Sequence, residues 1–158
     1  MIALLDNTVL SNFALVKRLP LLVQVFGKHL ATTPYVVQEY EDGVRRGRVP
    51  PISFDWIAVL PLTRDELTQM THLQQQVDAG EASCLAVALG RQGIVLSDDR
   101  NARQVAGQIG VAISGTLGVL VRLIKVGVLS LEEANRLLAQ MIVYGYRSPV
   151  ETLEQLIK

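Results

Sequence analysis

Acidic side chains stand at places in the sequence where a short apolar run ends or a predicted helix begins. Asp6 closes the run Ile-Ala-Leu-Leu, and Asp98 and Asp99 follow the run Ile-Val-Leu-Ser. Glu39 lies one turn into a predicted helix, and Glu81 opens another. Carboxylates held close together repel one another, and proteins keep them ionised mainly with a divalent cation such as Mg²⁺ or Mn²⁺. If the fold brings these residues together, we expect a divalent-metal site.

Each of these acids also has a simpler interpretation when taken alone. Asp6 could cap the helix that follows it, because Asp is a favoured N-cap. Glu39 has Glu41 and Asp42 close by, a pattern typical of a solvated helix face. Asp78 is expected to be an exposed turn residue. The metal interpretation therefore depends on several acids meeting at one place.

Strands and helices alternate along most of the chain. Apolar runs predict strands at residues 2–5, 29–33, 57–62, 94–96 and 111–113. Helical spacing and capping residues predict helices at residues 8–17, 20–26, 35–46, 65–73, 81–89, 100–107 and 115–126. Parallel strands need crossover connections, which helices usually supply. We therefore expect a three-layer α/β/α fold around a mainly parallel sheet, with the ligand site at the carboxyl ends of the strands.

The end of the chain is predicted to be purely helical. Ser130 and Glu133 form a capping box before a helix that runs to residue 143, and a final short helix is expected at residues 149–157. We expect a domain at residues 1–129 and a helical extension at residues 130–158 packed on the same domain. The apolar helices around residues 117–126 and 137–142 are either core or a surface for self-association.

Composition sets limits on the class of protein. Hydrophobic residues make up 49% and charged residues 19%, which indicates an ordered domain with a large core. The formal net charge is zero, so any binding of nucleic acid must come from a local basic patch. Five arginines follow the acidic positions closely enough to hold phosphates near a metal: Arg45, Arg46, Arg48, Arg100 and Arg103.

Several other classes of site are not supported. His29 and His72 are isolated and Cys84 has no paired cysteine, so no zinc site is expected. No glycine-rich phosphate loop follows the first strand, and no serine sits in a nucleophile elbow. The longest apolar stretch is too short to span a bilayer and no signal sequence is expected, so we expect a cytoplasmic protein without contact to a membrane.

The order of these motifs resembles the PIN domain family. The resemblance rests on residues 4–8, 33–39, 80–82 and 96–99 and covers residues 1–125. It points in particular to the small prokaryotic PIN proteins that resemble toxins of toxin and antitoxin pairs, in which the Ser-Gly-Thr-Leu-Gly of residues 114–118 also recurs. No single motif is specific, whereas their order and spacing together are.

The resemblance implies an endoribonuclease that cuts RNA with Mg²⁺ or Mn²⁺. Its ligands would be Asp6, Glu39, Glu81 and an aspartate of the Ser97-Asp98-Asp99 turn, with Asp99 as the principal ligand and Asp98 as a helper. The hydroxyl groups of Thr8 and Ser97 would support them. The resemblance also implies a homodimer and an antitoxin protein that blocks the site. One departure is the third acidic position, which carries Glu where many members carry Asp.

The working hypothesis is hydrolysis of RNA phosphodiester bonds by water bound to the metal, with no side-chain nucleophile. One alternative is a non-catalytic PIN-like module that holds RNA or a protein, which the intact acids at all four places disfavour. A second is a phosphate-receiving domain. That chemistry calls for a lysine after a late strand, whereas residues 111–113 lead into Ser114 and Gly115.

Overall fold

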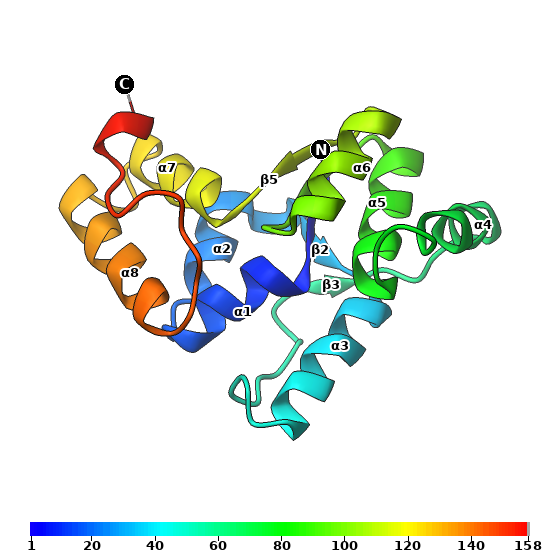
Figure 1. Cartoon of the computed structure of the whole chain (residues 1–158), viewed down its shortest axis with the longest axis horizontal. Coiled ribbons are helices and arrows are strands. Elements are labelled where there is room, and N and C mark those ends of the chain that lie inside the picture. The colour runs from blue at the N-terminus through cyan, green and yellow to red at the C-terminus, as the bar shows by residue number, and fades with distance from the viewer. Residues whose placement is uncertain (158) are drawn as a thin grey trace.

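The structure, a computed structural model that describes residues 1–157, contains one parallel five-stranded sheet (Figure 1). The strand order is β3-β2-β1-β4-β5. The strands are β1 (Ala3–Leu5), β2 (Leu30–Thr32), β3 (Ala58–Val59), β4 (Ile94–Leu96) and β5 (Ala112–Ser114). The chain builds the sheet outward from β1 in one direction and then continues with β4 on the other side, so the strand order reverses between β1 and β4. A ligand site is expected outside the carboxyl ends of the strands at such a switch point.

Helices cover both faces of the sheet, which confirms the predicted three-layer α/β/α fold. Figure 1 shows α1, α2, α7 and α8 on one side of the strands and α3, α4, α5 and α6 on the other. The helices are α1 (Asn7–Leu15), α2 (Pro20–Phe26), α3 (Pro34–Arg45), α4 (Arg64–Leu73), α5 (Ala79–Arg91), α6 (Arg100–Ile109), α7 (Thr116–Lys125) and α8 (Leu131–Val143), with short 3₁₀ turns η1 (Gly27–His29) and η2 (Glu154–Leu156).

The buried residues form one core that extends across both helix layers. On α7 and α8, Leu120, Leu123, Leu137 and Leu138 are buried, so the apolar faces of these helices lie in the core. The α8 helix packs against α7 and α1. Cys84 is fully buried, and burial raises the pKa of its thiol, as expected of an unreactive core cysteine. Within residues 1–157, no helix combines the length and apolar character needed to cross a bilayer.

Two elements differ from the sequence-based expectation. The helix predicted at residues 149–157 is wrong, since this segment is irregular apart from the short turn η2. Its backbone donors are used by side chains: Val150 N donates to Ser148 Oγ at 3.2 Å, and Leu153 N donates to Asn135 Oδ1 at 2.8 Å. The strand predicted at residues 57–62 shrinks to the edge strand β3.

Helix α4 is held against α5 by a partly buried ion pair. Glu66 is buried, and its carboxylate accepts hydrogen bonds from Arg91 Nε and Nη2, both at 2.8 Å. The same carboxylate accepts from Thr63 N at 2.8 Å, which completes the capping box that begins α4. Arg91 also donates to the carbonyl oxygen of Pro61 at 3.0 Å. This pair therefore fixes where α4 begins and how it lies on α5.

We predict that Arg91→Ala lowers the free energy of unfolding by about 1–3 kcal/mol, because a charged hydrogen-bond partner is lost and Glu66 stays buried. Arg136→Ala is the matched control, since Arg136 forms an exposed pair with Glu132 on α8 and such pairs contribute about 0.3–0.5 kcal/mol. Urea denaturation measures both. Equal losses in the two variants would contradict the assignment.

Candidate functional site

The carboxyl ends of β1 and β4 bring two acidic segments of the chain together. Asp6 directly follows β1, and its backbone N–H donates to the carbonyl oxygen of Leu96, the last residue of β4, at 3.0 Å. Ser97, Asp98 and Asp99 follow β4. The site therefore forms at the reversal of strand order, at the carboxyl ends of the central strand β1 and its neighbour β4.

Asp6 is buried and only partly satisfied. Its side chain is 1% exposed, and Oδ2 accepts a hydrogen bond from Ser97 Oγ at 2.9 Å, while Oδ1 has no partner within residues 1–157. Asp6 stands at the N-cap of α1, yet its carboxylate makes no capping hydrogen bond. Burial raises its pKa to about 7, and the nearby Asp78 and Asp99 carboxylates add to that shift. The simple capping interpretation of Asp6 is therefore wrong.

Glu81, in the first turn of α5, and Asp99, the N-cap of α6, lie close to Asp6. Glu81 is buried, and its pKa is raised to about 9 by burial first and then by the carboxylates of Asp6, Asp78 and Asp99. Asp99 caps α6 by accepting a hydrogen bond from Ala102 N at 2.8 Å. Both helices thus begin at the site and present a carboxylate to it.

Glu39 reaches the group from α3. Thr33 caps this helix and accepts from Val36 N at 3.3 Å, so Glu39 lies on its second turn. Within the described residues Glu39 Oε1 is buried without a hydrogen-bond partner. Burial, then the charges of Asp78 and Asp6, raise its pKa. The carboxylate lies directly against the backbone of α5, so that a Cβ added at Gly80 would overlap Glu39 Oε1.

Asp78 belongs to the same charged group, although it was expected only as an exposed turn residue. It is exposed, and it caps α5 by accepting from Glu81 N at 2.9 Å. Its charge contributes to the raised pKa values of Asp6, Glu39 and Glu81. The signal in the sequence was its position three residues before Glu81, which places both acids at the start of one helix.

Asp98 is directed away from this group. Its Oδ1 accepts from Thr116 N at 2.7 Å, and its Oδ2 accepts from Thr116 Oγ1 at 2.5 Å and from Asn12 Nδ2 at 3.2 Å. These contacts join the end of β4 to the beginning of α7 and to α1. Asp98 therefore fixes the turn after β4, and its neighbour Asp99 carries the carboxylate that lies beside Glu81.

Two hydroxyl groups organise the turn beneath the carboxylates. Ser97 Oγ donates to Asp6 and accepts from Asp99 N at 3.1 Å. Thr8 Oγ1 accepts from Asp98 N at 2.8 Å and lies 3.4 Å from Ser97 Oγ. The expected support of Asp6 by a threonine hydroxyl is thus indirect, because Ser97 makes the direct contact.

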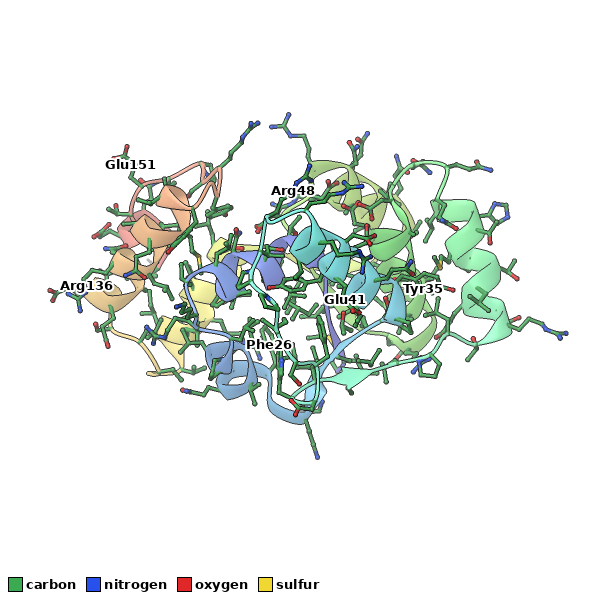
Figure 2. The ribbon with its side chains drawn as sticks, turned by 90° about the horizontal axis from the view of Figure 1, so that it is seen from below. Phe26, Tyr35, Glu41, Arg48, Arg136 and Glu151 are labelled. Atoms are coloured by element: carbon green, nitrogen blue, oxygen red, sulfur yellow. The ribbon has the colours of Figure 1, made fainter. Side chains whose placement is uncertain are left out.

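Basic residues line two clefts beside the carboxylates. A cleft of about 410 Å³ includes Glu39, Arg46 and Arg48, and Figure 2 shows Arg48 near the middle of the molecule beside α3. A second cleft, of about 950 Å³, includes Arg100 and Arg103. Arg45 differs from the others because it pairs with Asp42 on its own helix.

A family model described as PIN domain matches residues 2–158. The chain belongs to the PIN domain family. No curated protein matches it. PIN domains are generally nucleases that depend on divalent metal ions, so the chain is a nuclease-like module.

The acidic group of this PIN domain fits a divalent cation in its chemistry. Two buried carboxylate oxygens, Asp6 Oδ1 and Glu39 Oε1, have no partner among residues 1–157. Oxygen is the ligand that Mg²⁺ and Mn²⁺ prefer. Within the same residues, no three carboxylate, histidine or cysteine side chains converge in the geometry of a formed metal site. The acidic side chains therefore surround a common region without meeting at one point.

The raised pKa values predict how stability depends on pH without added metal. Asp6 and Glu81 take up protons more readily in the folded protein than in the unfolded chain. The free energy of unfolding should therefore fall as pH rises. The contribution of Asp6 is lost between pH values of about 4 and about 7, and that of Glu81 between about 4 and about 9. Thermal unfolding in EDTA between pH 5 and pH 9 measures this.

In the same experiment, Mn²⁺ should raise the melting temperature more at pH 8 than at pH 5, because a cation binds ionised carboxylates. Asp6→Asn should reduce both the pH dependence and the effect of Mn²⁺. A melting temperature in EDTA that rises steadily up to pH 9 would contradict the arrangement of the acidic group.

Gly80→Ala is predicted to displace the Glu39 carboxylate, because the new methyl group would overlap it. We expect Mn²⁺ affinity, measured by calorimetry, to fall by at least about tenfold. Gly107→Ala is the control, since a Cβ there meets nothing within 4 Å. Unchanged affinity in Gly80→Ala would show that Glu39 takes no part in binding the ion.

Proposed function

We propose that this PIN domain is an endoribonuclease that depends on Mg²⁺ or Mn²⁺ and hydrolyses RNA phosphodiester bonds. One observation carries the proposal: Asp6 and Glu39 each hold a buried, unpartnered carboxylate oxygen within a group of four or more acids. If these acids served only the stability of the fold, neutral residues in their place would make the protein more stable, because burying carboxylates without partners costs free energy.

Asp6, Glu39, Glu81 and Asp99 would hold the ion. When bound, the ion supplies a water molecule of lowered pKa and neutralises charge on the phosphate. This chemistry needs no side-chain nucleophile, and the hydroxyl groups of Thr8 and Ser97 are engaged in the turn after β4.

The remaining residues of the site position the reacting groups. Ser97 orients Asp6 and, through Asp99 N, holds the start of α6. Arg46 and Arg48 on one side and Arg100 and Arg103 on the other offer guanidinium groups to the phosphates of a strand lying across the acids. The choice of RNA is supported by membership of the PIN family.

The proposal extends to a role as the toxin of a toxin and antitoxin pair. It is supported by the resemblance of residues 80–82 and 114–118 to small PIN proteins of that kind. An antitoxin protein that covers the acidic group and a homodimer would be its partners. Growth arrest on expression of the intact chain, relieved by Asp6→Asn, would support this role.

The test of the nuclease function is cleavage of a mixed RNA substrate by the purified protein in Mn²⁺, Mg²⁺ or EDTA. Asp6→Asn and Asp99→Asn should lower the rate by roughly a hundredfold or more, because each removes an anionic ligand of the ion that would neutralise charge on the reacting phosphate. Asp55→Asn, an exposed loop residue, is the control and should leave the rate unchanged.

Two results would overturn the assignment. Undiminished cleavage by Asp6→Asn, with its circular dichroism unchanged, would place the chemistry elsewhere. RNA binding without cleavage in any metal would favour the alternative function, a non-catalytic module that holds RNA.

A further inference from the structure

The larger cleft has a wall that the chain supplies after α8. This wall is the segment of residues 145–149. The rest of the lining includes residues at the start of α1 and of the turn between β5 and α7, such as Thr8 and Gly115. Its volume of about 950 Å³ lies within the range of ligand pockets, roughly 300–1,000 Å³. The cleft is thus formed by parts of the chain that are far apart in sequence.

Three arginines line this cleft: Arg100 and Arg103 from α6, and Arg147 from the wall. All three are exposed, and among residues 1–157 none of them forms an ion pair, in contrast to Arg91 and Arg136. Guanidinium groups gathered without carboxylate partners repel one another, and binding an anion relieves that repulsion. Their planar, forked geometry suits phosphate in particular.

Asp98 does not neutralise these arginines by direct pairing. It is the one carboxylate among the described residues that line the cleft, and both of its oxygens accept hydrogen bonds from Thr116 or Asn12. The cleft therefore keeps a positive excess, although the whole chain has a formal net charge of zero.

The wall is held in place by its own contacts. Tyr146 N donates to the carbonyl oxygen of Met141 at 3.0 Å, and Ser148 Oγ accepts from Val150 N. Leu153, a few residues further on, is fully buried, and its N–H donates to Asn135. Arg147 is exposed between these fixed points, so the wall can present it without first becoming ordered, and less affinity is lost on binding.

The cleft adjoins the acidic group. Asn7 and Thr8, which line it, directly follow Asp6. The smaller cleft, with Arg46 and Arg48, shares Asn7 and Ser11 with it. A strand that passes over the start of α1 would therefore meet arginines on both sides of the carboxylates.

We propose that residues 145–149 form the outer wall of a subsite for single-stranded RNA, in which Arg147 acts with Arg100 and Arg103 to bind backbone phosphates next to the cleaved bond. The choice of RNA rests on the proposed function. A single strand fits because the arginines line a recess of about 950 Å³, whereas a duplex presents its phosphates on a broad convex surface. Tyr146 lines the same cleft and offers a ring on which a base can stack.

The test is fluorescence anisotropy with a labelled single-stranded oligoribonucleotide and the matched duplex, in EDTA so that binding is measured without cleavage. Arg147→Ala should weaken binding of the single strand about tenfold and lower the slope of log affinity against log salt by roughly 0.7. Arg103→Ala combined with Arg147→Ala should weaken it further. Arg136→Ala is the control, because Arg136, labelled near one end of the molecule in Figure 2, pairs with Glu132 on α8 and is not among the described residues that line the cleft.

The outcomes separate this inference from the nuclease function. Wild-type protein that binds the single strand through Arg147 but never cleaves it would leave the subsite standing and overturn the proposed function. Unchanged binding by Arg147→Ala, an equal loss in Arg136→Ala, equally tight binding of the duplex, or no binding by the wild type would each overturn the subsite. Cleavage could still occur in any of those cases.

Discussion

Repulsion among buried carboxylates is the constraint on which the rest of this structure depends. Asp6 lies at the end of the central strand of the sheet, shielded from water, with one oxygen unpartnered among the described residues. Glu39 and Glu81 reach the same region from two helices, and burial raises the pKa of all three. A fold selected for stability alone would not collect these groups, because each raises the free energy required to ionise the others. Their convergence is therefore best understood as a requirement of function.

The local structure limits that repulsion by using helix ends. The helices α1, α5 and α6 all begin at the site, and the positive end of a helix dipole favours negative charge. The carboxylates of Asp78 and Asp99 each accept a capping hydrogen bond from a backbone N–H, whereas that of Asp6 does not. The caps thus serve two purposes, since they begin the helices and hold acids at defined positions. Ser97 performs the corresponding task for the turn after β4.

Charge of opposite sign is kept apart from the acids and not paired with them. The exposed arginines of the two clefts flank the carboxylates. The arginines that form ion pairs are Arg45 on α3, Arg91 on α5 and Arg136 on α8. Had the guanidinium groups paired with Asp6 or Glu81, they would have lowered the pKa of those acids and left no place for a cation. A neutral chain can therefore present an acidic centre between basic margins, an arrangement suited to a phosphodiester strand.

The sequence by itself determined the alternation of strands and helices, the parallel sheet, and the positions of Asp6, Glu39, Glu81 and Asp99 at its carboxyl edge. These features follow from local signals, namely apolar runs, caps and helical spacing, which act over a few residues. Tertiary structure alone decided that Asp98 turns toward Thr116 and Asn12, that the charge of Asp78 joins the acidic group, and that residues 145–149 line a cleft. The physical reason is that these outcomes depend on hydrogen bonds and charges between segments distant in the chain. The backbone N–H of Leu153, for example, donates to Asn135, whereas in the helix predicted there it would donate to a carbonyl oxygen one turn earlier.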